Sequence, residues 1–459
     1  MTLEEILALA ESTVLSVNKT SLTAKDKEVK GVHDLYEDSV KMAKHISYHA
    51  VKGEFPEELF INRSPNQTQK EYDYIKANYK QYTLPEYTDY INTITRPFGD
   101  GNWAIDYREE EEVNVIANKT FQEYVEMELP IYGSLEAFVK TILPNLKTID
   151  ANGFIGIRPK EIEFVLNDSN ESVVSNELYK PTIYFYESKN VIDYKEGLYY
   201  LFLSIEKSIV NTVGGKKREG NIYELYTKEG VYFFKQFGVK SDNKFERELF
   251  FEYSGYCPVQ QLKGVPQLKG DEILWKSPFL FGVDLLDLVA VNSNWLQFSI
   301  NKCVFPMTVM IGDKCEFTDE NGATCVDGIL HGYIGDNQYH KSCTRCNGSG
   351  LTGRLSPLGT LLIKSTTNLD KDETKSSQPP LSYVSPEVTT LEFVEKKIDK
   401  DTLKARQILK LRNRNSIVSE GKITATEVFD DAKGMTAFIK PIADQIFSIY
   451  EFCLKTIGR

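Results

Sequence analysis

Two long helical segments, separated by residues 306–384 with four of the seven cysteines, constrain this chain more than any other feature of its sequence. The first segment covers 276–305, begins with Ser277-Pro278 and has a wide apolar face. The second covers 385–412, and its apolar residues recur with a helical period at Leu391, Val394, Ile398 and Leu403. We therefore predict a two-helix stalk that carries a small domain at its end.

The cysteines of this small domain have the spacing of a metal site. They lie within 32 residues, at Cys315, Cys325, Cys343 and Cys346. The last two form a CxxC motif, and the glycines after it allow a tight turn that points backbone N–H groups at the sulfurs. The first two are further apart and need a small hairpin, for which Asp319-Glu320-Asn321-Gly322 supplies the turn.

We predict that these four cysteines bind a structural zinc ion, because the domain is too small to bury a sufficient core of its own. The main variant replaces one cysteine with His331 or His340. The alternative is that all four are free thiols of a protein made in a reducing compartment, since an odd cysteine total does not indicate a secreted disulfide framework.

Known catalytic patterns are missing from the sequence. It has no GxxxxGK[ST] phosphate loop, no Gly-x-Ser-x-Gly and no His-Glu-x-x-His, and its five histidines are scattered. Asp284 and Asp287, three apart near a helix start, are expected to favour the helix dipole. We predict that the chain is not an enzyme, and a metal-dependent enzyme of unfamiliar type is the least favoured hypothesis.

The net charge of −12 argues against a repressor or a nuclease, because tight nucleic-acid binding needs clustered Lys and Arg. A weakly repulsive wall is compatible with a pore that conducts a polyanion, since each phosphate contact would slow its transit. No apolar run reaches the length of a membrane span, and the acidic N-terminus does not read as a signal peptide. We expect no membrane association.

The rest of the chain predicts an α+β fold. Residues 1–150 read as helices, including a long one from Phe121 to Leu146, with a loop at Arg96–Gly101. Residues 151–275 switch to an alternation of period two and predict an antiparallel sheet. After the second stalk helix come a polar turn at 413–422 and a last helix at 423–459.

This order of parts resembles the portal proteins of tailed bacteriophages, the head–tail connector family. In that family two stem helices flank a small clip domain, and a loop toward the channel precedes a final helix. The resemblance implies that 1–150 and 151–275 form the helical and β-rich parts of a wing. It also implies that 276–305 and 385–412 are the stem, 306–384 is the clip and 413–422 is the tunnel loop.

The resemblance also implies a function. Portal proteins form a ring, here expected to be a dodecamer, at the capsid vertex of the virion after assembly in the host cytoplasm. Double-stranded DNA passes through the ring, which docks the large terminase, the major capsid protein and the head–tail adaptor. The implied channel-facing residues are Arg412, Asn413, Arg414, Asn415 and Ser416. The alternatives left open are an ordinary surface connection at this loop, and a zinc-ribbon adaptor or scaffold that never forms a ring.

Overall fold

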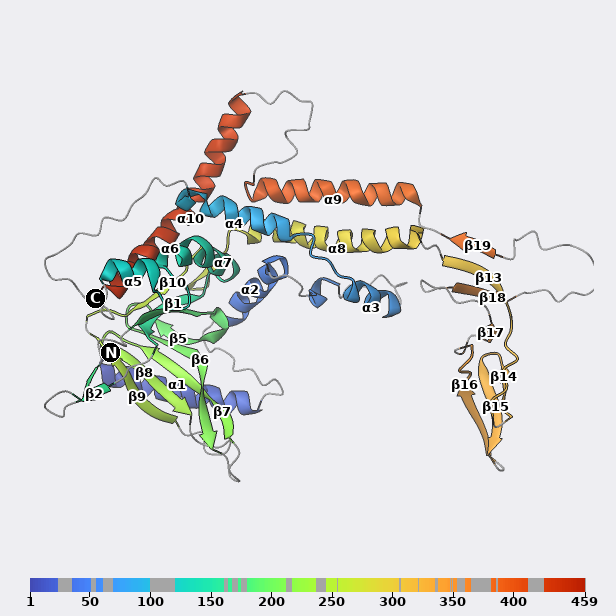
Figure 1. Cartoon of the computed structure of the whole chain (residues 1–459), viewed down its shortest axis with the longest axis horizontal. Helices are drawn as coiled ribbons and strands as arrows, with labels where there is room; N and C mark the ends of the chain where they lie inside the picture. The colour runs from blue at the N-terminus through green and yellow to red at the C-terminus, as the bar shows by residue number, and fades with distance from the viewer. Residues whose placement is uncertain are drawn as a thin grey trace, which may run out of the picture. The chain divides into compact units, whose positions relative to one another are not determined.

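The structure of the chain is a computed structural model, and it describes residues 1–23, 35–50, 55–60, 69–99, 120–160, 164–166, 172–174, 180–211, 217–236, 245–253, 255–304, 307–320, 322–334, 337–346, 348, 350–352, 360–364, 381–384, 387–411 and 425–458. The described part mixes helices with mostly antiparallel sheets, as the sequence predicts for an α+β protein (Figure 1). It divides into two compact units. Unit 1 contains 1–56, 81–287 and 402–459, and unit 2 contains 57–80 and 288–401.

Unit 1 contains two larger antiparallel sheets and two hairpins. The five-stranded sheet has the order β5-β6-β7-β8-β9, and the three-stranded sheet has the order β10-β1-β4. The strands are β1 (Phe154–Pro159), β2 (Phe164–Leu166), β3 (Ser172–Val174), β4 (Pro181–Tyr186), β5 (Val191–Lys195), β6 (Tyr199–Asn211), β7 (Lys217–Tyr226), β8 (Gly230–Gln236), β9 (Phe245–Glu252), β10 (Val259–Gln261), β11 (Val265–Lys269) and β12 (Glu272–Lys276). β2 pairs with β3, and β11 with β12.

Helices precede, connect and follow these strands. They are α1 (Leu3–Thr23), α2 (Tyr36–Ala50), α4 (Leu84–Gly99), α5 (Phe121–Met127), α6 (Leu135–Ala137), the π-helical turn η2 (Phe138–Ile142), α7 (Leu143–Ile149), the 3-10 turn η3 (Ser188–Asn190) and α10 (Ala425–Ile457). Two further helices have residues in both units: α8 (Leu280–Val304) and α9 (Val388–Ile408).

The alternation of side chains along the strands stacks unit 1 into layers. On β6, Tyr199 and Leu201 pack against α1, whereas Tyr200 and Phe202 face the three-stranded sheet. On β1, Phe154 faces the five-stranded sheet and Ile155 faces the helices. Because successive side chains of a strand point to opposite faces, each sheet joins two cores. The resulting order is α1, five-stranded sheet, three-stranded sheet, then helices.

A buried ion pair lies between the two sheets. Arg158 of β1 donates from Nε and Nη2 to the two carboxylate oxygens of Glu224 on β7, at 2.8 and 3.0 Å. Tyr186 donates to the same carboxylate at 2.6 Å, and Ser204 also donates to it. The Arg158 guanidinium lies 3.9 Å from the ring centroid of Tyr184. Both charges are fully buried, and these contacts offset their loss of hydration.

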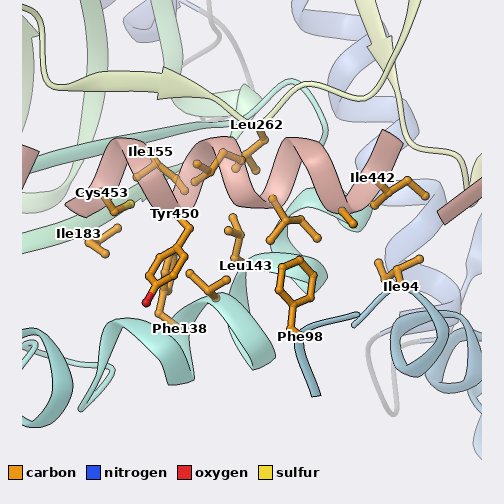
Figure 2. Close-up of a cluster of buried hydrophobic side chains, with 14 of the residues drawn as sticks. Ile94, Phe98, Phe138, Leu143, Ile155, Ile183, Leu262, Ile442, Tyr450 and Cys453 are labelled. Atoms are coloured by element: carbon orange, nitrogen blue, oxygen red, sulfur yellow. The ribbon is translucent and has the colours of Figure 1, made fainter. Parts of the chain in front are cut away.

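The largest core joins the three-stranded sheet to the helices. Figure 2 shows side chains of α10, among them Ile442, Tyr450 and Cys453, meeting Phe138 and Ile183 in one cluster. All five are buried. The apolar period that the sequence shows in its last segment thus has a clear cause, because one face of α10 covers this core.

Two predictions for the N-terminal helices are wrong. The segment Phe121–Leu146 is not one helix, because a tight loop at Pro130–Gly133 separates α5 from α6. Within that loop Ile131 has a φ of 75°, a region that favours glycine. Conversely, the predicted loop at Arg96–Gly101 begins as helix, since α4 extends to Gly99 with Pro97 inside it and Phe98 in the core.

The stalk helices α8 and α9 pack against each other in unit 1, where the start of α8 meets the end of α9. Phe279 and Val283, at the start of α8, share the large core with Ala405 and Leu409, at the end of α9. A methyl group on Gly282 would lie 2.8 Å from Cγ of Leu409, so glycine allows this close approach. The last turn of α9 is held by Arg406, which forms ion pairs with Glu86 and Asp89 on α4.

Unit 2 holds the other ends of the same two helices. The strand after α8, β13 (Met307–Lys314), pairs antiparallel with the strand before α9, β19 (Leu381–Val384) (Figure 1). β13 also pairs with β17 (Leu351–Thr352) and, in parallel, with β18 (Thr360–Lys364). Further elements of unit 2 are the 3-10 turn η1 (Glu57–Phe60), α3 (Gln69–Ala77), β14 (Thr324–Val326), β15 (Ile329–Ile334) and β16 (Asn337–Ser342).

Candidate metal centre

Three of the four clustered cysteines lie in a short strand or directly after one, and the fourth, Cys346, lies in the turn that follows Cys343. Cys315 directly follows β13, Cys325 lies in β14, and Cys343 directly follows β16. The strands β14, β15 and β16 form an antiparallel sheet whose pairing sets Cys325 opposite Leu330. A backbone hydrogen bond of 2.8 Å from Cys343 N to Gly328 O closes the base of this sheet. The sheet therefore brings thiols from distant positions of the sequence together.

The sulfur atoms form one compact cluster. All four Sγ atoms lie within 4.8 Å of one another. Sγ of Cys315 is 3.9 Å from that of Cys343, and Sγ of Cys325 is 3.7 Å from that of Cys346. All four residues are buried, and none of them forms a disulfide. The sequence prediction that these cysteines converge is confirmed.

Backbone N–H groups point at these sulfurs from tight turns. The thiol of Cys325 accepts from the backbone of Gly328, and that of Cys346 accepts from Gly348 and Gly350. The three glycines have φ values of 95°, 82° and 71°. A side chain at Gly328 would also collide with the carbonyl of Gly348, 2.1 Å from an added Cβ. All three positions favour glycine by their backbone conformation, and Gly328 and Gly350 also by the close approach of neighbouring backbone atoms.

The thiols differ in how easily they ionise. Burial raises the pKa of Cys315 above its usual range, and burial with a hydrogen bond to Cys343 raises the pKa of Cys325 to about 12. Burial also opposes ionisation of Cys346, but backbone N–H groups and neighbouring thiols outweigh it and lower its pKa to about 7. Near neutral pH the thiol of Cys346 is therefore partly ionised, and the thiolate is the form that binds a metal ion.

The cysteines also make up most of the core around them. We call the four cysteines together with β14, β15 and β16 the cysteine module. Among the described residues, its buried cluster consists of the four cysteines with Ala323 and Leu330, and Phe317 packs against it. Two aliphatic side chains are too few to hold a three-stranded sheet by burial alone. Four thiolates at these distances suit a soft or borderline divalent metal ion in tetrahedral coordination. The site can hold such an ion, and its ligands would then join β13, β14 and β16 to the CxxC turn.

Neither histidine of the module belongs to this cluster. His331 pairs with Thr324 across the strands, one position away from the pair formed by Leu330 and Cys325. Because successive residues of a strand face opposite sides, Leu330 points into the cysteine core and His331 points away from it. His340 is paired with His331 and is exposed. The variant in which a histidine replaces a cysteine is therefore wrong.

The second set of predicted site residues cannot be placed. Arg412, Asn413, Arg414, Asn415 and Ser416 all lie outside the described residues. The structure does describe the residue before them, Leu411, whose backbone N–H donates to the carbonyl of Arg406 at 2.8 Å.

Sequence reasoning missed a polar cluster built on two helices of unit 1. Asp287 of α8 contacts Nε2 of His45 at 2.5 Å and Nε2 of His49 at 3.0 Å, while Nδ1 of His49 lies 2.8 Å from the hydroxyl of Thr83. Burial opposes ionisation of Asp287, but its hydrogen bonds to the two histidines lower its pKa. Asp287 thus has specific partners beyond the helix dipole. The signal was the spacing of four between the histidines, which places both on one face of a helix.

Four of the five histidines occur in two pairs, so the prediction that they are scattered is wrong. Among the described residues, the four cysteines are the one group of three or more His, Cys, Asp or Glu side chains with metal-site geometry. In the same part of the chain, no helix combines the length and apolar character that a membrane crossing requires. No protein-family model and no curated protein sequence matches the chain.

Proposed function

We propose that this chain is the portal protein of a tailed bacteriophage. In this proposal many copies form a ring at the capsid vertex, and double-stranded DNA passes through the ring during packaging and ejection. The chain itself catalyses no reaction, and a separate terminase motor drives the DNA. Its function would then depend on the shape and charge of the channel.

The observation that carries the proposal is the arrangement of α8 and α9 around the cysteine module. At one end the two helices share a core through Val283 and Leu409. At the other end the strand that follows α8 pairs with the strand that precedes α9, with Met307 opposite Val384. A long helix therefore leads into the module and another leads back, which is the order of stem, clip and stem that the resemblance implies.

Both helices expose large apolar side chains. The exposed fraction is 67% for Phe393 and 64% for Val388 on α9, and 51% for Phe281 and 46% for Leu288 on α8. Apolar side chains in solvent along a helix are typical of a surface that another chain covers. In a ring the stem helices of neighbouring subunits would cover them, and the same contact would repeat around the symmetry axis.

The charge of the chain fits a conduit better than a tight DNA-binding protein. Exposed residues of α9 alternate in sign, as in Glu395-Lys396-Lys397 and Asp399-Lys400. A wall of mixed charge on a chain of net charge −12 would let a polyanion slide without strong binding. In the proposal the tunnel loop that contains Arg412–Ser416 contacts the DNA.

The cysteine module would be the clip. We propose zinc as its metal, because four cysteine ligands are the usual set of a structural zinc site. A metal-bound module has a fixed surface, which suits a docking site for the terminase and later for the tail adaptor. The ion would have a structural role, since four protein ligands leave no open position for a substrate.

Native mass spectrometry and electron microscopy of the purified chain test the ring. The proposal predicts closed rings of about twelve copies. Phe393→Ser should shift the population toward monomers, whereas Met127→Ser, at a similarly exposed apolar position on α5, serves as the matched control. A wild-type chain that stays monomeric at high concentration would refute the portal proposal.

A second candidate function is a zinc-ribbon adaptor or scaffold that does not form a channel. The observation that favours it is that the cysteine module has a core of its own. Such a protein would bind metal as a monomer, and a partner would be captured by the module alone. The same mass measurement separates the two functions, because the adaptor predicts one chain and one metal ion per particle.

A further inference from the structure

We propose that His331 and His340 form a second metal site, separate from the cysteine cluster, which binds a divalent transition-metal ion with a preference for nitrogen ligands. The site lies on the outer face of the β15–β16 hairpin. It needs neither the portal proposal nor the identity of the ion at the cysteines.

The strand register brings the two histidines together. His331 of β15 and His340 of β16 are directly opposite each other in an antiparallel pair. Opposite residues of such a pair share one face of the sheet, with their Cβ atoms about 5 Å apart. Their Nδ1 atoms are hydrogen-bonded to each other at 2.9 Å, and the ring centroids are 4.7 Å apart. Each imidazole thus turns the same nitrogen toward the other ring, and an ion that binds both nitrogens would replace the proton between them.

The distance between the nitrogens is compatible with two adjacent ligands of one ion. An ion about 2.05 Å from each Nδ1 would make an N–metal–N angle of about 90°, given the 2.9 Å separation. A tetrahedral site would instead need nitrogens about 3.3 Å apart. An angle near 90° suits the tetragonal or octahedral preferences of Ni²⁺ and Cu²⁺. The pair would supply two adjacent ligands and leave the other positions to water.

The surroundings give the pair a rigid base and an open approach. The hairpin ends at the pair Ile329–Ser342, next to Cys343, and the histidines stand two positions further along it, roughly 7 Å away. Thr324 of β14 lies beside His331 on the same face and is exposed. His340 is exposed and His331 is partly exposed. An ion can therefore reach the pair from solvent without disturbing the cysteine core.

Calorimetric titration of the zinc-loaded, untagged chain with Ni²⁺ tests this site. Ni²⁺ is the probe because Cu²⁺ would oxidise thiols. We expect the wild-type chain to bind one more Ni²⁺ than His340→Ala, or to bind it about tenfold more tightly. His331→Gln should reproduce the loss from the other strand. Lys341→Ala is the control, since it is adjacent to His340 but lies on the opposite face.

The amount of metal bound at the cysteines shows whether a variant that loses Ni²⁺ binding has lost only its ligands or also the fold of the hairpin. Both histidine variants should keep the same sulfur-bound metal per chain as the wild type, because their side chains do not face the cysteines. Identical Ni²⁺ isotherms for the wild type and both variants would overturn the proposal. So would a loss of the cysteine-bound metal in both variants, because the histidines would then be needed for the fold of the hairpin.

Discussion

The layered core of unit 1 and the cysteine core of unit 2 differ in the kind of side chains that hold their strands together. In unit 1, two sheets bury aromatic and aliphatic side chains on both faces, and the charged side chains of Arg158 and Glu224 between the sheets pair with each other. Among the described residues of unit 2, the core around the CxxC turn contains six buried side chains, of which four are cysteines. Because burial scales with size, the large region is expected to fold from its own contacts, whereas the small module needs an added ligand.

The two regions also differ in how they treat buried charge. Glu224 is a buried anion whose partner, Arg158, is supplied by the chain. The cysteine cluster would carry several negative charges when its thiols ionise, and its sulfur atoms lie close to one another. A bound cation is the natural partner for such a set. In unit 1 the buried anion has a counter-charge from the chain itself, whereas the four cysteines of the module form a group that could bind a cation.

Removal of the metal should have the largest effect, and it should affect the module alone. Incubation with a strong chelator, or the substitution Cys343→Ser, is expected to unfold β14, β15 and β16, because the metal ion that joins their cysteine ligands is then lost. Hydrogen exchange measured by mass spectrometry should show these strands exchanging at the rate of an unfolded chain, while β6 and β7 of unit 1 stay protected. Full protection of the three strands without metal would contradict the claim that the module, unlike unit 1, needs a bound ion to fold.

Removing one partner of the buried ion pair should be nearly as costly, but in the other region. Glu224→Ala leaves the Arg158 guanidinium buried without its main partner, so we expect a loss of about 3–5 kcal/mol in the free energy of unfolding of unit 1. Urea denaturation followed by tyrosine fluorescence measures it. Glu206→Ala is the matched control, because Glu206 contacts the same arginine but is 42% exposed. Equal losses in the two variants would contradict the account.

The close approach of the stalk helices predicts a moderate effect. Gly282→Val places a branched side chain against Leu409 in a filled core, so we expect the free energy of unfolding to fall by about 1–3 kcal/mol. Gly434→Ala, on α10, is the opposite case, because an added methyl there meets no atom within 4 Å. That variant should be neutral or slightly more stable, since alanine favours a helix. Thermal unfolding of both variants checks the difference in sign.

The smallest effect is a dependence on pH from the buried amine of Lys147. Burial lowers the pKa of this residue to about 7, and its Nζ donates to the carbonyls of Leu262 and Lys263. Above pH 7 the unfolded chain binds more protons at this position than the folded chain, so stability rises with pH until the unfolded lysine titrates. The free energy of unfolding of the wild type relative to Lys147→Met should therefore increase between about pH 7 and 9, by up to roughly 1 kcal/mol per unit.

Urea titrations of both chains at several pH values check this slope. The same slope in the two chains would show that Lys147 is charged in the folded state, held by its carbonyl partners. Metal content should be measured at each pH, so that a change in the cysteine module is not mistaken for the effect of this lysine.

Much of the local structure was predictable, because period-two and helical patterns are properties of the sequence alone. The strands around Tyr199–Leu203 and Tyr223–Tyr226 followed from alternation and turn residues. What alternation does not show is which face meets which layer, since Tyr200 and Leu201 are both large side chains that a core can bury. Pro97 predicted a loop, yet burial of Phe98 in the large core outweighs the cost of a proline near the helix end.

The candidate metal site also has features that the sequence predicted and features that it could not. The CxxC spacing and its glycines were sufficient to predict that the four cysteines converge. The histidines could not be assigned, because their side of the sheet depends on the register that pairs Thr324 with His331. A shift by one residue would have turned His331 toward the cysteines. The contact of Asp287 with His45 and His49 joins α8 to α2, and such distant pairings are outside the reach of local patterns.

X-ray absorption at the zinc edge, combined with a metal count, tests the central claim most directly. The purified chain, washed free of loosely bound ions, should contain one zinc per copy, surrounded by four sulfur atoms at about 2.3 Å. Cys325→Ser should lower the sulfur count or abolish binding. A wild-type chain that carries no tightly bound metal, with all four thiols reacting while the three strands remain folded, would contradict the account.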